Sequence, residues 1–109
     1  MTDAFARIVE DGGDADDILR STVTALADSP GVVWAEIAFL DRGALVPGPA
    51  AGAEDGARRT AMPILFDGTP VGELRADGDV TPGLLGYVAG LVAPYVLIGW
   101  DTGGEAWVP

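Results

Sequence analysis

Five side chains that could bind a polar ligand occur in segments whose composition is typical of β-strands. They are Trp34 and Glu36 in one segment, Glu73 and Arg75 in a second, and Arg59 near the start of a third. Because alternate residues of a strand share a face, these side chains can converge on one face of a sheet. An aromatic platform with two acids and two bases would suit a polar ligand. The same residues could instead be cross-strand ion pairs on a solvated face, which is the commoner outcome.

The composition removes several kinds of catalysis. The chain of 109 residues has no cysteine and no histidine, so disulfides, thiolate nucleophiles, imidazole chemistry and the usual zinc sites are absent. Glu36 and Glu73 could exchange protons as a carboxylate pair, but their spacing does not mark a hydrolytic pair. We therefore expect a protein that is not an enzyme and that uses no cofactor.

An acidic cluster near the N-terminus could suggest calcium. It consists of Asp11, Asp14, Asp16 and Asp17. An EF-hand loop needs glycine at its sixth position and glutamate at its twelfth, whereas counting from Asp11 gives Asp16 and Thr22. We expect no metal site here, only a solvated start of a helix.

Two segments carry the strand patterns that would position the candidate residues. Val32–Leu40 is rich in β-branched and aromatic residues and predicts a central strand, with Val33, Ala35, Ile37 and Phe39 facing the helices. Arg58–Phe66 and Thr69–Ala76 predict a hairpin, because Asp67-Gly68 supplies the positive φ angles of a tight turn. Pro63 cannot donate a ladder hydrogen bond, so it predicts an edge strand or a bulge. A short strand at Ala44–Val46 and a loop at Pro47–Gly56 complete this region.

Three helices are expected around these strands. Ala4, Phe5, Ile8 and Val9 lie on one side of a short helix that Gly12-Gly13 ends. Asp14 is a candidate N-cap for a second helix, which Ser29-Pro30-Gly31 stops. Thr81 with Pro82 predicts the start of a long apolar helix that reaches about Trp100, with a kink or an early end at Pro94. We assign residues 1–100 to one domain and residues 101–109 to a polar tail.

Small residues along the last helix predict association. Gly86, Gly90 and Ala93 follow the spacing that lets two helices approach closely. The same residues could instead pack on the sheet of one monomer. We expect a homodimer, and we read the uncharged stretch Gly83–Trp100 as a core or dimer helix rather than a membrane span, because no basic residue flanks it.

The net charge of −11 limits the partners. An acidic surface repels nucleic acid and anionic lipid, so we expect neither nucleic acid nor membrane as a partner. The first 17 residues are acidic and lack a continuous apolar core, so we see no secretion signal and expect a cytoplasmic protein.

The order helix, helix, strand, strand, loop, hairpin, long helix resembles the GAF domain family of small-molecule sensors. Two local patterns carry the resemblance: the helix from Ile18-Leu19 that runs into the strand ending at Phe39, and Met62–Leu74, in which Asp67-Gly68 turns the chain into Val71-Gly72-Glu73-Leu74. The resemblance implies an α+β fold with an antiparallel sheet and the N- and C-terminal helices on one face. It also implies a ligand pocket on the opposite face, under a lid that here would be the short connection Pro47–Ala57.

The resemblance gives two functional expectations. The first is a non-enzymatic signalling module that binds a small molecule or mediates protein association, acting through a partner protein that the sequence does not identify. The alternative is a protein–protein adaptor without a pocket, similar to roadblock and profilin-like domains. Family members that reduce free methionine sulfoxide use cysteines, so that activity is not expected here.

Overall fold

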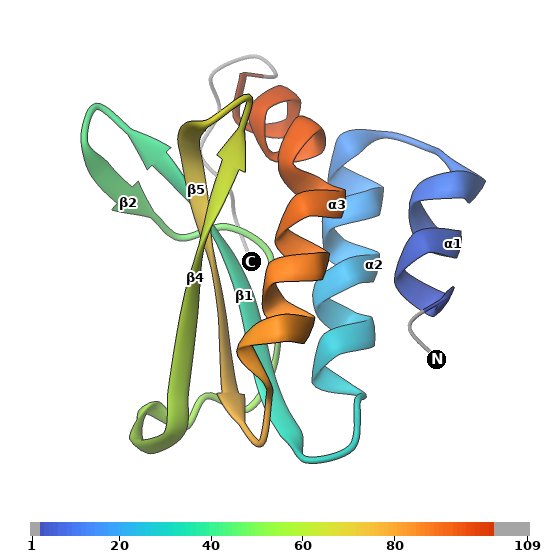
Figure 1. Ribbon diagram of the computed structural model, residues 1–109, viewed down its shortest axis with the longest axis vertical. Helices are drawn as coiled ribbons and strands as arrows, with labels where there is room; N and C mark the ends of the chain where they lie inside the picture. Colours follow the sequence, from blue (N-terminus) through green and yellow to red (C-terminus); the bar gives the residue numbers. More distant parts are fainter. Residues whose placement is uncertain (1–2, 102–109) are drawn as a thin grey trace.

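The computed structural model describes residues 3–101, with side chains described for residues 4–97. It is an α+β fold in which an antiparallel sheet carries the helices on one face (Figure 1). The elements are α1 (Asp3–Asp11), α2 (Ala15–Ala27), β1 (Val32–Asp41), β2 (Ala44–Val46), β3 (Ala50–Gly52), the 3-10 turn η1 (Gly56–Arg58), β4 (Arg59–Phe66), β5 (Thr69–Gly78) and α3 (Pro82–Asp101). The expected fold class and element order are confirmed.

The sheet has the order β2-β1-β5-β4, and the short strand β3 also pairs with β1. Within the described chain the two long strands β1 and β5 are therefore central, while β4 forms one edge. Helices α2 and α3 pack against the sheet, and α1 packs outside them against both (Figure 1). We call the sheet face turned away from the helices the outer face.

The hairpin turn forms where the dipeptide predicts it. Asp67 and Gly68 have φ angles of 56° and 81°, as a two-residue turn between right-twisted strands requires. The turn joins β4 to β5, and Pro63 lies in the edge strand, where its missing N–H is tolerated.

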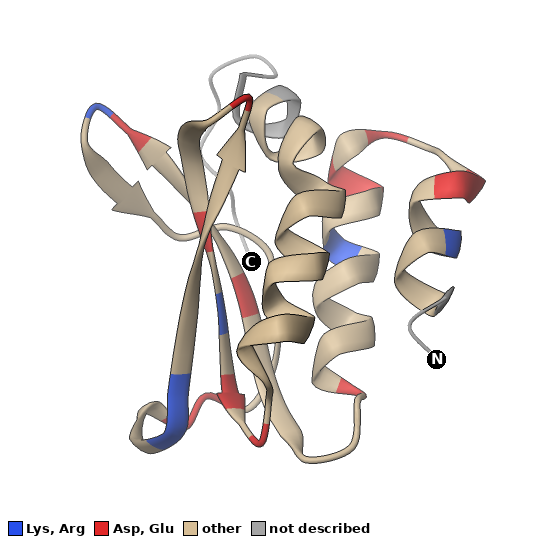
Figure 2. Cartoon of the chain, viewed as in Figure 1, with Lys and Arg blue, Asp and Glu red and all other residues tan. Residues whose placement is uncertain are grey.

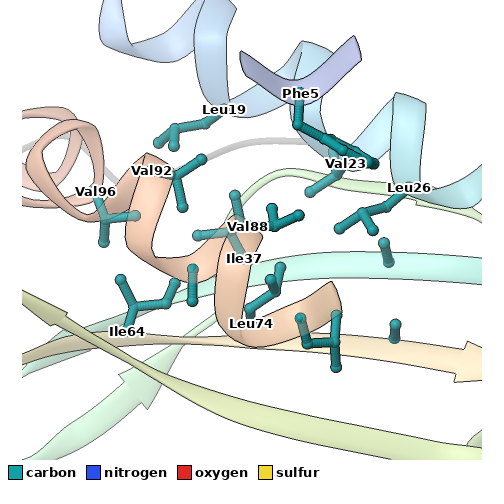
Figure 3. Packing of buried hydrophobic residues seen from close by; sticks show 14 of the residues in the cluster. Phe5, Leu19, Val23, Leu26, Ile37, Ile64, Leu74, Val88, Val92 and Val96 are labelled. Carbon is teal, nitrogen blue, oxygen red and sulfur yellow. The ribbon is translucent and has the colours of Figure 1, made fainter. Parts of the chain in front are cut away.

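The core lies between the sheet and the helices. From β1 it takes Ala35, Ile37 and Phe39, and from β5 it takes Leu74 and Ala76, all of them fully buried. Figure 3 shows Ile37 and Leu74 meeting apolar side chains of the helices, among them Leu19, Val23 and Leu26 of α2 and Val88, Val92 and Val96 of α3. Since this burial uses one face of each strand, the alternate residues must lie on the outer face.

One expected core residue lies elsewhere. Val33 was expected to face the helices, but its exposed fraction is 45%, and Val32 is in the core instead. The pairing of β1 with β5 shifts register between Val32 and Trp34. A bulge of this kind adds one residue to the strand and so reverses the facing of the residues before it.

The connection that was expected to be a loop contains a strand. β3 pairs with β1, with Gly52 opposite Trp34 and Ala50 opposite Glu36. Alanine and glycine are poor strand formers, so composition alone does not predict this strand. Its small residues instead let the backbone lie close to β1.

The helix ends follow the capping residues in part. The Asp14 side chain makes no capping hydrogen bond, although its carbonyl accepts from the Ile18 N–H at 3.0 Å. α3 begins at Pro82 and reaches Asp101, close to the expected end at Trp100, so of the two alternatives expected at Pro94 the early end was wrong. The expected tail from residue 102 onward lies outside the described residues.

In the described part of the chain, no helix combines the length and hydropathy that a membrane crossing requires.

Replacing Thr81 with alanine should destabilise the protein by about 1 kcal/mol, the usual cost of losing an N-cap. The Thr81 hydroxyl accepts a hydrogen bond from the Leu84 N–H at 3.2 Å at the start of α3. Urea denaturation followed by circular dichroism would measure the change. Thr81→Ser keeps the acceptor and should retain most of the stability; equal losses in both variants would contradict this role.

Candidate functional site

The strand register lines up four of the five candidate residues in two rows across the outer face. In the first row Arg59 of β4 lies opposite Asp77 of β5, which lies opposite Trp34 of β1. In the second row Arg75 of β5 lies opposite Glu36 of β1. The rows are adjacent and share one face, and Glu73 lies on the same face two residues before Arg75, so the five predicted residues lie within one patch.

The first row is held by a buried carboxylate. Asp77 is fully buried and accepts two hydrogen bonds from the Arg59 guanidinium, at 2.8 Å from Nε and 3.1 Å from Nη2. The Arg59 guanidinium carbon also lies 4.5 Å from the centre of the Trp34 ring. Arg59 is thus fixed by a two-point ion pair and by a cation–π contact.

Arg75 of the second row forms ion pairs with Glu36 and with Glu73. Arg75 Nη1 lies 3.1 Å from Glu36 Oε1, and Arg75 Nε lies 2.7 Å from Glu73 Oε1. These side chains are only partly buried, with exposed fractions of 25% for Arg75, 11% for Glu36 and 29% for Glu73. The row is therefore shielded from bulk water but still reachable from solvent.

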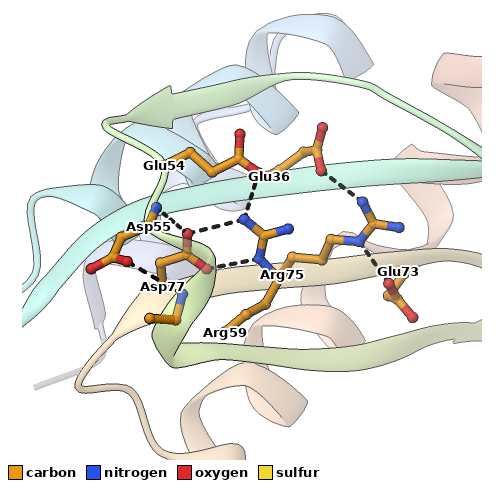
Figure 4. A network of polar contacts seen from close by, with 8 residues as sticks. Glu36, Glu54, Asp55, Arg59, Glu73, Arg75 and Asp77 are labelled. Carbon is orange, nitrogen blue, oxygen red and sulfur yellow. Dashed lines mark hydrogen bonds and ion pairs between the residues drawn. The ribbon is translucent and has the colours of Figure 1, made fainter.

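The chain between β3 and β4 reaches over the first row (Figure 4). The Asp55 N–H donates to Asp77 Oδ2 at 2.6 Å, and Glu54 Oε2 lies 2.6 Å from Arg59 Nη2. The Asp55 side chain in turn accepts from the Ala57 N–H and caps η1. Asp77 and Arg59 thus hold this connection against the outer face.

The pKa values of Asp77 and Glu36 are shifted in opposite directions. Hydrogen bonding from Arg59 holds the pKa of Asp77 below its usual value; burial opposes the shift, and the Asp55 N–H adds to it. Burial raises the pKa of Glu36; the charge of Arg75 opposes this, and the nearby Glu54 carboxylate adds to it. The carboxylates also raise the pKa of both guanidinium groups, with Asp77 the main cause for Arg59 and Glu73 for Arg75.

The lowered pKa of Asp77 predicts a stability change in acid. A carboxyl group whose pKa is lower in the folded than in the unfolded state contributes stability above its unfolded pKa, near 4, and loses it as pH falls through the folded value. The stability difference between wild type and Asp77→Asn should therefore be large at pH 7 and shrink below about pH 4. Urea denaturation at pH 7, 4 and 3 would measure it. A difference that stays constant with pH would contradict the ion pair.

The prediction from sequence missed two residues of this patch, Asp77 and Glu54. Asp77 lies one residue past the predicted strand Thr69–Ala76, but it continues the alternation of Glu73 and Arg75 on β5, and that spacing could have found it. Glu54 is in the irregular connection, where no periodicity marks it.

The residues expected to pair two helices lie in different environments. Gly86 and Gly90 are on the exposed surface of α3, and a Cβ at Gly90 would meet no atom within 4 Å. Ala93 has an exposed fraction of 3% and packs in the core, so it does not share that surface. The difference arises because only one side of α3 packs against the rest of the protein. The spacing of small residues along the sequence does not show which side that is.

Within residues 3–101, no three acidic side chains are grouped so that they could hold a metal ion.

No protein-family model matches the sequence, and no curated protein matches it. Solved structures are similar in fold. The GAF domain of Acinetobacter phosphoenolpyruvate-protein phosphotransferase superposes with a TM-score of 0.72 at 13% identity, over 94% of this chain and 96% of that chain. The fRMsr of Staphylococcus aureus in complex with its substrate has a TM-score of 0.68 at 16% identity, over 87% and 92%. Free methionine-R-sulfoxide reductase of Neisseria meningitidis, also with its substrate, has a TM-score of 0.68 at 16% identity, over 88% and 89%.

The prediction that the chain is not an enzyme is contradicted by these structures. Several proteins with this fold are free methionine-R-sulfoxide reductases, so the fold itself hosts enzymes. The prediction rested on the missing cysteine and histidine, which limit the chemistry of a site but do not exclude catalysis by other groups. At these identities the likeness establishes the fold, and the chain has a GAF-like fold.

Proposed function

We propose that this chain is a regulatory GAF-like module that binds a small polar molecule on the outer face, around Trp34, Glu36, Arg59, Glu73 and Arg75. The observation that carries the proposal is the convergence of partly buried charges beside a buried aromatic ring. A few well-placed polar groups next to an aromatic surface are typical of small-molecule sites. The S. aureus and N. meningitidis structures, which contain their substrates, show that this fold can hold a small molecule.

Arg75 supplies the main anchor in this proposal. It is central in its row, it is one quarter exposed, and its Nη2 atom makes no hydrogen bond within the described residues. A ligand could therefore reach Arg75 without first breaking its contacts with Glu36 and Glu73. This distinguishes Arg75 from Arg59, which Asp77, Glu54 and Trp34 already surround.

A metabolite screen tests this proposal. Nucleotides, amino acids, amines and organic acids would be tested by thermal shift and then by NMR titration of the ¹⁵N-labelled protein. We expect one ligand class to raise the melting temperature and to shift resonances of β1 and β5. For a ligand that offers an acceptor group to Arg75, Arg75→Gln should abolish both effects, whereas Arg7→Gln, on exposed α1, should abolish neither. Because the fold hosts enzymes, each binding compound would also be incubated and analysed for chemical change. A flat screen would overturn the proposal.

A second function, protein association, is supported by the surface of α3. No charged residue lies between Pro82 and Leu97, although the whole chain carries a charge of −11 (Figure 2). The exposed part of this helix combines Gly86 and Gly90 with Tyr87 and Leu97, which are 41% and 44% exposed. We propose that this surface pairs two copies of the chain, which act in the cytoplasm through a further protein partner.

Light scattering after size exclusion tests the association. Wild type should elute as a dimer and Gly90→Leu as a monomer, because the larger side chain would keep two helices apart. A Cβ at Gly90 meets no other atom, so the variant should fold. A monomer in both proteins would contradict the association surface.

A further inference from the structure

We infer that the outer face selects a small organic molecule carrying a primary ammonium group, and that this group lies between Glu36 of β1 and Glu54 of the connection. This inference rests on the proposed function and names the class of ligand for the same site. The ligand chemistry follows from the charges, the free acceptor atoms and the neighbouring apolar residues of the patch.

The patch has too few cations of its own. Four carboxylates, from Glu36, Glu54, Glu73 and Asp77, share two guanidinium groups. Two negative charges therefore remain uncompensated in a partly buried region, where charge is less well screened than in open solvent. A cationic group would compensate one of them, whereas an anionic ligand would add to the imbalance.

The excess charge is concentrated between Glu36 and Glu54. Their side chains lie next to each other in Figure 4, and the Glu54 charge adds to the effect of burial, which is the main cause of the raised pKa of Glu36. The two glutamates are held by different arginines, Glu36 by Arg75 and Glu54 by Arg59. No described guanidinium bridges them, so a ligand cation could.

Each of these glutamates keeps an acceptor atom for the ligand. Glu36 bonds through Oε1 and Glu54 through Oε2, so in residues 4–97 Glu36 Oε2 and Glu54 Oε1 accept no hydrogen bond. No buried side-chain oxygen of the described residues lacks a partner, which means that Glu36 Oε2 is open to solvent. An ammonium group has three donors, enough to bond both free oxygens at once.

A metal ion fits this site less well than an organic cation. The described carboxylates are not grouped as metal ligands, and Ca²⁺ and Mg²⁺ take six or more oxygen ligands, waters included. Exposed apolar residues of β4, Ala61 and Pro63, lie on the same face in the rows of Arg75 and Glu73. They give the hydrocarbon part of a ligand a surface to contact.

Matched probes test the charge preference. Pentylamine, pentanoate and 1-pentanol have five carbons each and differ in charge, and norvaline adds an ammonium group at C2 of pentanoate. NMR titrations of the ¹⁵N-labelled protein at fixed ionic strength should show shifts around β1 and the connection with pentylamine, and none with pentanoate or pentanol. If norvaline also binds, the site takes amino acids; if only pentylamine binds, it takes simple amines. Both results support the ammonium site.

Glutamine variants distinguish the site from general attraction to an acidic protein. Glu36→Gln and Glu54→Gln should each weaken pentylamine binding about tenfold, since each removes one charge-assisted hydrogen bond. Glu10→Gln, on exposed α1, makes the same change of charge and should leave binding unaltered. Equal weakening in all three variants would overturn the inference, because the amine would then be a diffuse counterion.

The inference and the proposed function fail in different ways. Binding of an anion or a neutral metabolite that Arg75→Gln abolishes, with no response to amines, would overturn the ammonium site and leave the proposed function standing. No binding by any class of compound would overturn both.

Discussion

Replacing Asp77 with alanine should lower the free energy of unfolding by about 2–3 kcal/mol, slightly less than the usual cost of breaking a fully buried ion pair. Asp77 is fully buried and accepts hydrogen bonds from Arg59 and from the Asp55 N–H. The alanine variant leaves both donors without their acceptor. Because the Arg59 side chain has an exposed fraction of 28%, water can replace part of the hydrogen bonding that Arg59 loses with Asp77. Urea denaturation at pH 7 would measure the change.

Asp79 offers a matched control for this experiment. It is two residues further along the chain and also pairs with an arginine, Arg58, but its side chain is 79% exposed. An exposed ion pair contributes little, so Asp79→Ala should change the stability by less than about 0.5 kcal/mol. If the two variants lost the same stability, Asp77 would be an ordinary surface acid and the connection would be held by something else.

Replacing Gly52 with alanine should cost about 2–4 kcal/mol and detach β3 from β1. Gly52 has a φ angle of +92°, which L-residues rarely adopt, and a Cβ there would lie 2.2 Å from the Val33 carbonyl oxygen. Strain and overlap both oppose the substitution. Because Glu54 and Asp55 follow directly, loss of β3 should also shift their amide resonances and weaken any ligand contact of Glu54.

Gly56 provides the control in the same connection. A Cβ at Gly56 meets no atom within 4 Å, and its φ angle is not positive. Gly56→Ala should therefore leave the free energy of unfolding and the amide spectrum of β3 nearly unchanged. Equal destabilisation by the two variants would indicate that the connection needs flexibility in general rather than a close approach at Gly52.

Gly52→Ala and Asp77→Ala both test how the connection is positioned over the outer face. Gly52 brings it close to β1, while Asp77 and Arg59 hold its far end. The connection is short, yet it places Glu54 beside Glu36. A ligand between these glutamates would link the sheet to the connection and so could change how firmly the connection is held.

The five residues taken from sequence as site candidates do share one patch, because strand alternation is a local property. Their individual partners were not predictable. Arg75 and Glu73 are neighbours on one strand, but the pairing of Arg75 with Glu36 joins residues 39 positions apart. Asp77 became the main partner of Arg59 only through the register of β4 on β5.

The sequence by itself determined the features that depend on a few adjacent residues: the Asp67-Gly68 turn, the edge position of Pro63, the start of α3 at Thr81-Pro82, and the apolar alternation of β1 and β5. Backbone dihedral preferences and side-chain periodicity act within a few residues, so these features are readable locally. Tertiary structure alone decided the bulge that turns Val33 outward, the pairing of β3, the burial of Ala93, and the contacts of Asp77 and Glu54. Each of these depends on how distant segments pack and in which register, which sets burial and charge at the outer face.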